Sequence, residues 1–76
     1  MTMITELDRV ILTTNIPDYG LETGDIGTVV LVHQGGKGYE VEFVTLSGET
    51  IVVVSLFAEQ VRSLSSREIA HARVLV

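Results

Sequence analysis

Two histidines and a pair of glutamates are the residues whose chemistry stands out first. His33 and His71 could each ligate a metal, but a metal site needs three or four ligands fixed in space, and no spacing in the chain groups them in that way. Glu40 and Glu42 share one face of a predicted strand, about 6.5–7 Å apart, which is near the separation of a catalytic carboxylate pair. Acids at this spacing are also typical of a solvated strand face, and no nucleophile motif accompanies them. We therefore expect a chain that is not an enzyme and that holds no metal and no cofactor.

Two glycine-rich segments, residues 24–27 and 35–38, could be interpreted as phosphate cradles built from backbone N–H groups. Such a cradle needs a helix N-terminus or a nest, usually with a lysine. The first segment runs instead into a β-branched stretch, and the second lacks the Lys-Ser/Thr ending of a P-loop. Both are therefore predicted to be turns, the first a corner that leads into a strand and the second a hairpin loop.

The charge balance argues against a nucleic-acid ligand. The 76 residues include ten Asp and Glu but only five Lys and Arg, for a net charge of −5. Each bound phosphate needs a basic residue beside it, and the bases are scattered along the chain: Arg9, Lys37, Arg62, Arg67 and Arg73. Cysteine is absent, which excludes disulfides and is typical of a reducing cytosol. With no visible signal peptide and no apolar run of 18 residues, we expect a cytoplasmic protein outside the membrane, with no small-molecule substrate indicated.

The elements that must position these residues are short strands. Alternating or continuous apolar residues predict strands at 7–14, 26–33, 39–46 and 50–56, a 3-10 turn near 57–60, and a closing strand at 61–64. Tyr39, Val41 and Phe43 are expected to share a buried face. The chain is therefore expected to be all-β, a single domain over residues 1–76 that forms a small SH3-like barrel of five or six short antiparallel strands.

Residues 64–76 are predicted to form a C-terminal extension that packs on or beside the barrel. Ser65 and Glu68 have the spacing of a capping box, so a short helix through residues 69–72 is one interpretation. The β-rich end of the chain favours the other, a turn at 66–69 followed by an extended segment at 71–75.

The apolar surplus is the strongest functional signal. Apolar residues make up 46% of a chain with little interior, and the strand at 51–54 has no polar face. Either the extension covers it, or it meets a second copy or another protein. The loop at residues 15–25 is long for so small a domain, and long ordered loops often carry recognition. We therefore predict partner-binding residues in both segments, with Tyr19 as an aromatic anchor: Pro17, Asp18, Tyr19, Leu21, Ile51, Val52 and Val54.

These segments carry a family resemblance. The Gly24–Val32 corner and strand, the Tyr39–Phe43 alternation and the Phe57–Val61 segment resemble the SH3-like small barrels. Over nearly its whole length the chain is similar to a family of short, uncharacterised bacterial proteins known only as a domain of unknown function. That family shares an opening like Asp8–Val10, a loop like Ile16–Leu21 and a tail like Glu68–Arg73.

The resemblance implies a non-catalytic role. The same small-barrel pattern is similar to the photosystem I subunit that helps dock ferredoxin and to the carboxy-terminal part of nitrile hydratase beta subunits. The photosystem subunit docks through basic residues, so its role does not carry over to an acidic chain. Some members of the uncharacterised family sit beside small toxin-like proteins, which implies an antitoxin role. The leading hypothesis is a protein-binding module, antitoxin-like or an accessory subunit of a larger partner, and the alternative is a nucleic-acid-associated barrel.

Overall fold

The computed structural model describes residues 3–75 and is built from five antiparallel strands and two 3-10 turns. The strands are β1 (Arg9–Leu12), β2 (Ile26–His33), β3 (Gly38–Val44), β4 (Thr50–Phe57) and β5 (Val61–Ser63), and the turns are η1 (Pro17–Tyr19) and η2 (Ala58–Gln60). They form one sheet in the order β4-β3-β2-β1-β5. This order confirms the predicted all-β small barrel with five strands.

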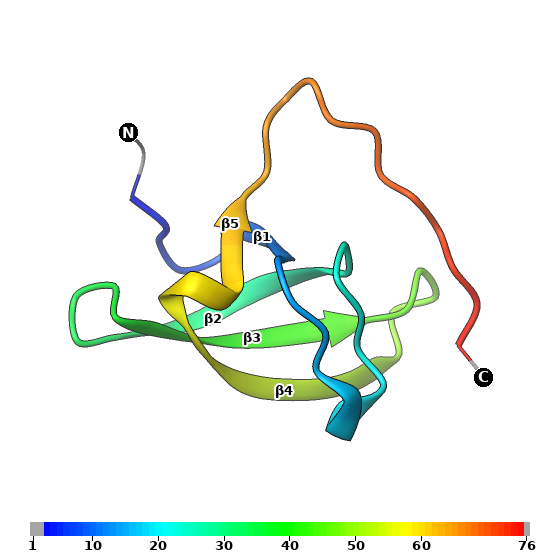
Figure 1. The fold of residues 1–76 in the computed structure, drawn as a ribbon, viewed down its shortest axis with the longest axis horizontal. Coiled ribbons are helices and arrows are strands. Elements are labelled where there is room, and N and C mark those ends of the chain that lie inside the picture. The colour runs from blue at the N-terminus through cyan, green and yellow to red at the C-terminus, as the bar shows by residue number, and fades with distance from the viewer. Residues whose placement is uncertain (1–2, 76) are drawn as a thin grey trace.

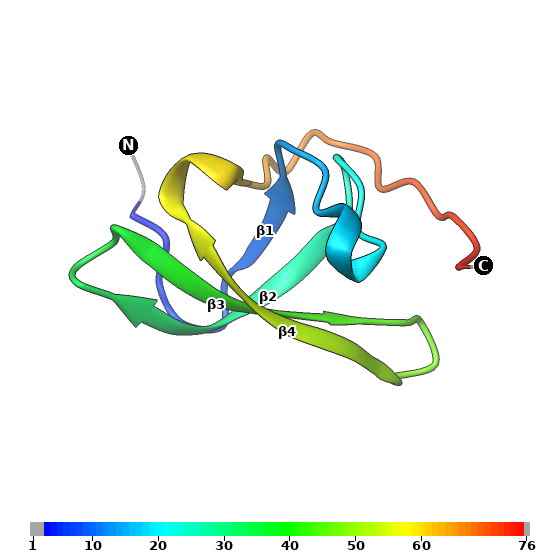
Figure 2. The ribbon, with the colours of Figure 1, turned by 60° about the horizontal axis from the view of Figure 1, so that its bottom comes forward.

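The sheet curls so that its two ends approach each other. The long strands β2, β3 and β4 form one twisted layer, and β1 and β5 cross above it (Figures 1 and 2). The turn η2 bridges the two layers, because the amide of Ala58 donates to the carbonyl of Lys37 at 3.1 Å and the amide of Thr13 donates to the carbonyl of Gln60 at 2.9 Å. The 3-10 turn predicted near 57–60 is therefore confirmed, and it helps to close the barrel.

The core follows the predicted alternation. Tyr39, Val41 and Phe43 all point inward from β3, as expected for a strand with one wet and one buried face. They pack with the inward side chains of the other strands and of the loop before β2: Val10, Leu12, Leu21, Val29, Val54, Leu56 and Val61. No buried residue is polar or charged within residues 3–75, so the interior is held by apolar packing.

The two glycines at the corner before β2 do different things. Gly24 has a φ of +96° and makes the turn, whereas Gly27 is a site of close approach. A Cβ built on Gly27 would lie 2.9 Å from the carbonyl oxygen of Glu42 and 2.9 Å from a ring carbon of Phe43. The sharp corner is therefore required by backbone conformation at the first glycine and by lack of space at the second.

Three local features differ from the sequence prediction. The first strand is shorter than residues 7–14, because Leu7 has a φ of +73° and the chain bends at Thr13. The third strand ends at Val44 rather than at residue 46. A register shift between Val29 and Leu31 interrupts the β2–β3 ladder, so that neighbouring residues 30 and 31 are both exposed instead of alternating.

The C-terminal extension lies beside the barrel. After β5 the chain turns at residues 66–67 and then runs without helix or strand to residue 75, passing along the side of the barrel in Figures 1 and 2. The extended interpretation is confirmed for these residues, and the helical one is wrong. The extension was predicted to end at Val76, which lies outside the described residues. In the part of the chain that the structure describes, no helix is long and apolar enough to cross a membrane.

Candidate partner-binding surface

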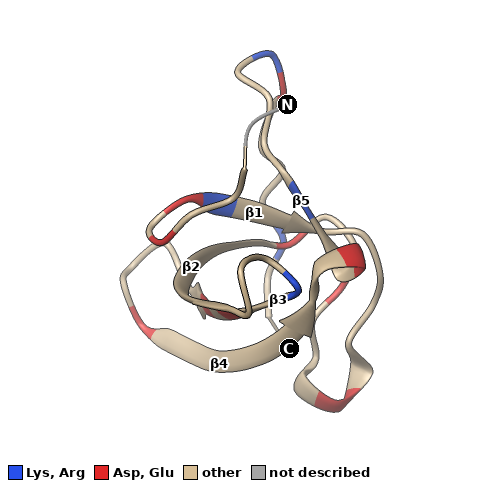
Figure 3. Cartoon of the chain, turned by 90° about the vertical axis from the view of Figure 1, so that its left-hand side faces the viewer, with Lys and Arg blue, Asp and Glu red and all other residues tan. Residues whose placement is uncertain are grey.

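Exposed apolar side chains gather on the outside of the β2–β4 layer. We call this set the outer face, and it consists of Val30, Leu31, Val44, Ile51 and Val53. Strand register places Val53 and Leu31 on the same side of the sheet, since they pair with Glu42 and Glu40, the outward residues of β3. Figure 3 shows that β4 carries no charged residue along its length. On this face the outward carboxylates of the central strand β3, Glu40 and Glu42, lie between the apolar residues of β2 and those of β4.

A small polar cluster interrupts the outer face. Oε2 of Glu40 is 2.7 Å from Nε2 of His33 and also accepts a hydrogen bond from the hydroxyl of Ser55. The hydrogen bond from Ser55 and then that from His33 lower the pKa of Glu40 below its usual range. The glutamate is the central group of this cluster, and the lowered pKa makes it a weaker base. The geometry is that of a cross-strand polar contact rather than a Ser-His-acid relay, in which the histidine stands between the other two.

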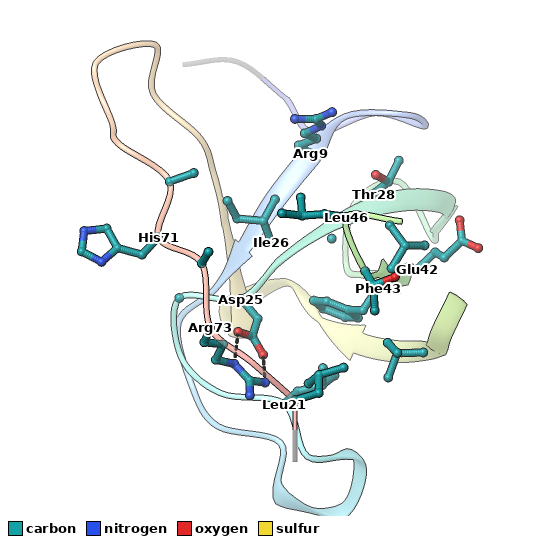
Figure 4. A pocket seen from close by; sticks show the side chains of 18 residues that line it. Arg9, Leu21, Asp25, Ile26, Thr28, Glu42, Phe43, Leu46, His71 and Arg73 are labelled. Atoms are coloured by element: carbon teal, nitrogen blue, oxygen red, sulfur yellow. Dashed lines mark hydrogen bonds and ion pairs between the residues drawn. The ribbon is translucent and has the colours of Figure 1, made fainter. Parts of the chain in front are cut away.

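A groove opens where the outer face meets the corner before β2. Its volume is about 730 Å³, and its apolar wall includes Ile26, Phe43, Val44, Leu46 and Ile51. Leu46 projects into this space in Figure 4 and is fully exposed. Arg9, Thr28 and Glu42 add polar groups to its lining. The groove therefore has a mixed lining, with apolar walls and a few polar groups.

The far end of the groove is closed by an ion pair. Nε of Arg73 donates to Oδ1 of Asp25 at 2.8 Å, and Nη2 donates to Oδ2 at 2.6 Å, in a bidentate contact (Figure 4). Nη2 also donates to the carbonyl oxygen of Gly20 at 2.9 Å, and Nη1 lies 3.7 Å from a carboxylate oxygen of Glu22. We call Gly20, Glu22 and Asp25 the acidic corner. It surrounds one guanidinium with oxygen atoms.

The pKa of Asp25 reflects this contact. Partial burial raises the pKa of its carboxyl, but hydrogen bonds from Arg73 and from the backbone amide of Glu22 outweigh burial, so the pKa lies below its usual value. The same pair raises the pKa of the Arg73 guanidinium. Asp25 is therefore a carboxylate, and Arg73 a cation, throughout the physiological pH range.

The residues predicted to bind a partner fall into three environments. Pro17, Asp18 and Tyr19 are exposed on η1, and Ile51 is exposed at the start of β4. Val52 is half-buried and packs against the core. Leu21 and Val54 are core residues with 4% and 6% exposure. Val54 faces inward from β4, and the side chain of Leu21 packs into the core from the loop before β2.

The structure brings one residue of each predicted segment together, since Leu21 and Ile51 both line the groove. Pro17 and Leu21 also border a shallow depression beside η1. Leu21 and Val54 expose little side chain to another protein, although Leu21 lines the groove, and a contact role for them stays a prediction. A contact role for the exposed residues stays a prediction.

Sequence reasoning missed the two ion pairs of the extension. Arg62 makes a bidentate contact with Glu68, at 2.9 and 2.7 Å, and Arg73 reaches Asp25 across 48 positions in the chain. The second pair has no local signature, because its partners are far apart in sequence. The only available signal was that several acids of an acidic chain lie in the loop at 15–25 while arginines lie in the extension. Among residues 3–75, no three metal-ligating side chains come together.

Comparison with known proteins identifies the family and adds no activity. A family model described as "Domain of unknown function (DUF4926)" matches residues 6–63, and the chain belongs to this family. The match spans every strand and both 3-10 turns, but it ends before the extension. No curated protein and no solved structure gave a significant match.

Proposed function

We propose that this member of the family is a non-catalytic module that binds another protein. The observation that carries the proposal is the outer face, on which five apolar side chains of three adjacent strands are exposed together. Single exposed apolar residues need no explanation, but five exposed on one side of a sheet, with carboxylates among them, form a mixed surface that another protein could cover. In so small a domain the exposed set is large relative to the core.

The charges beside the outer face favour a partner with basic groups. Glu42 lies next to Val53 across the β3–β4 ladder, and the chain as a whole has a net charge of −5. A symmetric dimer through this face would bring like charges close together, which disfavours a second copy as the occupant. A partner with an apolar centre and flanking Lys or Arg fits better. An accessory or antitoxin-like subunit, the form implied by the resemblance, would bind in this way.

The nucleic-acid alternative gains nothing from the geometry. Two of the five basic residues, Arg62 and Arg73, already neutralise carboxylates within the described chain. Phosphate binding depends on a continuous basic surface, and these pairs reduce the charge that is available for it. The cytoplasmic location expected from the sequence stays a prediction.

A matched pair of valine substitutions tests the proposal. Val53→Gln places an amide at the centre of the outer face, and Val74→Gln makes the same change at a valine that is 87% exposed in the extension. Each full chain is used as bait in a lysate of its own host, and retained proteins are quantified by mass spectrometry. We expect one protein that is retained by the wild type and by Val74→Gln, and reduced by at least about tenfold by Val53→Gln, a change of about 1.4 kcal/mol.

Light scattering on the same proteins separates the two kinds of occupant. A dimer that Val53→Gln converts to monomer would identify the second copy as the occupant, in place of a different protein. If no protein depends on Val53 and the chain is a monomer, the outer face is not an interface and the proposal is wrong.

A further inference from the structure

We propose that the acidic corner is a recognition site for an arginine in an extended segment of a protein partner, and that the C-terminal extension occupies it in the isolated chain. The proposal rests on the proposed function only in taking the ligand to be a protein. The acidic corner lies at the end of the groove, which adjoins the outer face at Val44 and Ile51. It also specifies which residue types the partner's segment must carry, whereas the outer face indicates only an apolar partner with basic groups.

The corner is shaped for a planar guanidinium. Asp25 offers both carboxylate oxygens to Nε and Nη2 of Arg73 in the fork geometry that lysine cannot reproduce. The carbonyl of Gly20 accepts a further hydrogen bond at 2.9 Å, and Glu22 adds negative charge on the Nη1 side. The site therefore selects arginine by geometry as well as by charge.

The corner is fixed by contacts that do not involve the extension. The backbone amide of Glu22 donates to Oδ2 of Asp25 at 2.8 Å, and the carbonyl of Asp25 accepts from the amide of Leu12, on β1, at 2.9 Å. Gly20 has a φ of +69° and ends η1, which sets the direction of the loop there. All three residues of the corner lie within the segment that the family model matches, so the site belongs to the barrel itself.

The extension, in contrast, has few attachments. Residues 69–75 form neither helix nor strand, and their hydrogen bonds to the barrel come from Arg73, while Leu75 is 43% exposed. Ile69 and Val74 are 86% and 87% exposed, so they gain little from the position they occupy. The Arg73–Asp25 pair is partly covered, with side chains 31% and 17% exposed, so the segment leaves its site when another arginine takes the place of Arg73. The extension has the properties of an exchangeable occupant.

The groove beside the corner defines what should follow the arginine. The extension itself forms one wall of the groove, through residues 70–73 and Leu75 but not through Val74. Leu75 thus shares the groove with Leu21 and Ile51. The geometry points to a ligand with arginine followed two positions later by a large apolar residue, with the residue between them free to vary.

Because the extension is tethered to the barrel, it competes strongly with any added ligand for the acidic corner. A segment linked by a short flexible connection has an effective concentration on the order of millimolar. A peptide that binds the open corner with a Kd of about 100 μM would therefore bind the wild-type chain about tenfold more weakly. A partner must present either a better sequence or additional contacts, which the nearby outer face could supply.

Peptide binding to full-length variants tests the proposal. The probe is a fluorescent peptide with the sequence of residues 68–75, followed by fluorescence anisotropy. Arg73→Gln opens the corner and Arg67→Gln removes the same charge from an exposed tail position, so it is the matched control. We expect Arg73→Gln to bind the peptide at least about tenfold more tightly than either the wild type or Arg67→Gln. Replacing the peptide's arginine by lysine or glutamine should abolish that gain.

A second measurement covers the case in which the variant does not fold. In the wild-type chain, excess peptide should displace the extension and shift the NMR signal of the Arg73 Nε–H group, which donates to Asp25. Failure of the folded Arg73→Gln chain to bind the peptide, or equal binding of the glutamine peptide, would show that the pair is only an internal tie. An unmoved Arg73 signal would show the same. None of these results bears on the Val53 comparison, so the two proposals can fail separately.

Discussion

The substitution Gly27→Ala probes the close approach on which the barrel depends. Gly27 is buried in β2, and its φ is not in the left-handed region, so alanine meets no backbone penalty there. The added methyl group would lie 2.9 Å from the carbonyl oxygen of Glu42, an atom of the β2–β3 ladder, and within 2.5 Å of a methyl group of Val41. This steric overlap can be relieved only if β3 moves away from β2.

The cost follows from two opposing effects. Overpacking in a well-filled core costs about 1–3 kcal/mol and more where backbone must shift, while replacing glycine restricts the unfolded chain and returns about 0.4–1 kcal/mol. We expect a net loss of about 2 kcal/mol. Because a domain of this size has only about 3–5 kcal/mol of stability, and 1 kcal/mol shifts Tm by about 4–8 °C, the Tm should fall by about 8–16 °C in a circular-dichroism melt.

Gly48→Ala supplies the control. Gly48 has a φ of +91°, and a Cβ there would meet no atom within 4 Å, so its cost is conformational only, about 1 kcal/mol. A loss at Gly27 no greater than the loss at Gly48 would mean that β2 and β3 do not pack as closely as described. The explanation of the corner given above would then be wrong.

Three further predictions concern the core, the loop and the extension. Leu12→Ala, at 1% exposure, should cost about 2–5 kcal/mol in a urea unfolding curve; a loss below 1 kcal/mol would contradict its place in the core. Tyr19→Ala should cost at most about 1 kcal/mol and Tyr39→Ala about 3–5 kcal/mol, because the two rings are 50% and 6% exposed; similar melts would refute this difference. The hydrogen bonds from Arg62 lower the pKa of Glu68 to about 2 from 4.5. The contribution of this pair to folding stability is therefore complete above pH 4.5 and is lost as the pH falls toward 2. An NMR titration of the Glu68 carboxyl with a midpoint near 4.5 would contradict the pair.

The strands could be predicted because their side chains alternate with a period of two. Tyr39, Val41 and Phe43 are separated by glutamates, and that pattern places three residues in the core without knowledge of any partner strand. The continuous apolar run in β4 was harder to interpret, since it does not say which positions face inward. Pairing with β3 decides this, and it buries Val54 while exposing Val53.

The candidate site was less accessible to sequence reasoning. The bulge after Val29 depends on how two strands pair, and the Asp25–Arg73 contact depends on the path of the extension. Leu21 sits in a segment whose glycine, proline and aspartate indicate a turn, and nothing local shows that its side chain closes the barrel. Long-range geometry, rather than residue type, separates the structural residues of this loop from the exposed ones.

The loop at residues 15–25 combines a core contact with the ion pair of the proposed recognition site. Leu21 anchors it in the core, and Asp25 holds its end through backbone contacts with Leu12 and Glu22, yet the carboxylate of Asp25 also faces the guanidinium of Arg73. The two members of this ion pair are therefore not equivalent, since removing Arg73 only releases the extension, whereas removing the Asp25 side chain also frees an amide of the loop. A corner that is rigid before its ligand arrives loses less entropy on binding. In the proposed exchange, one arginine-bearing segment therefore replaces another without any rearrangement of the corner.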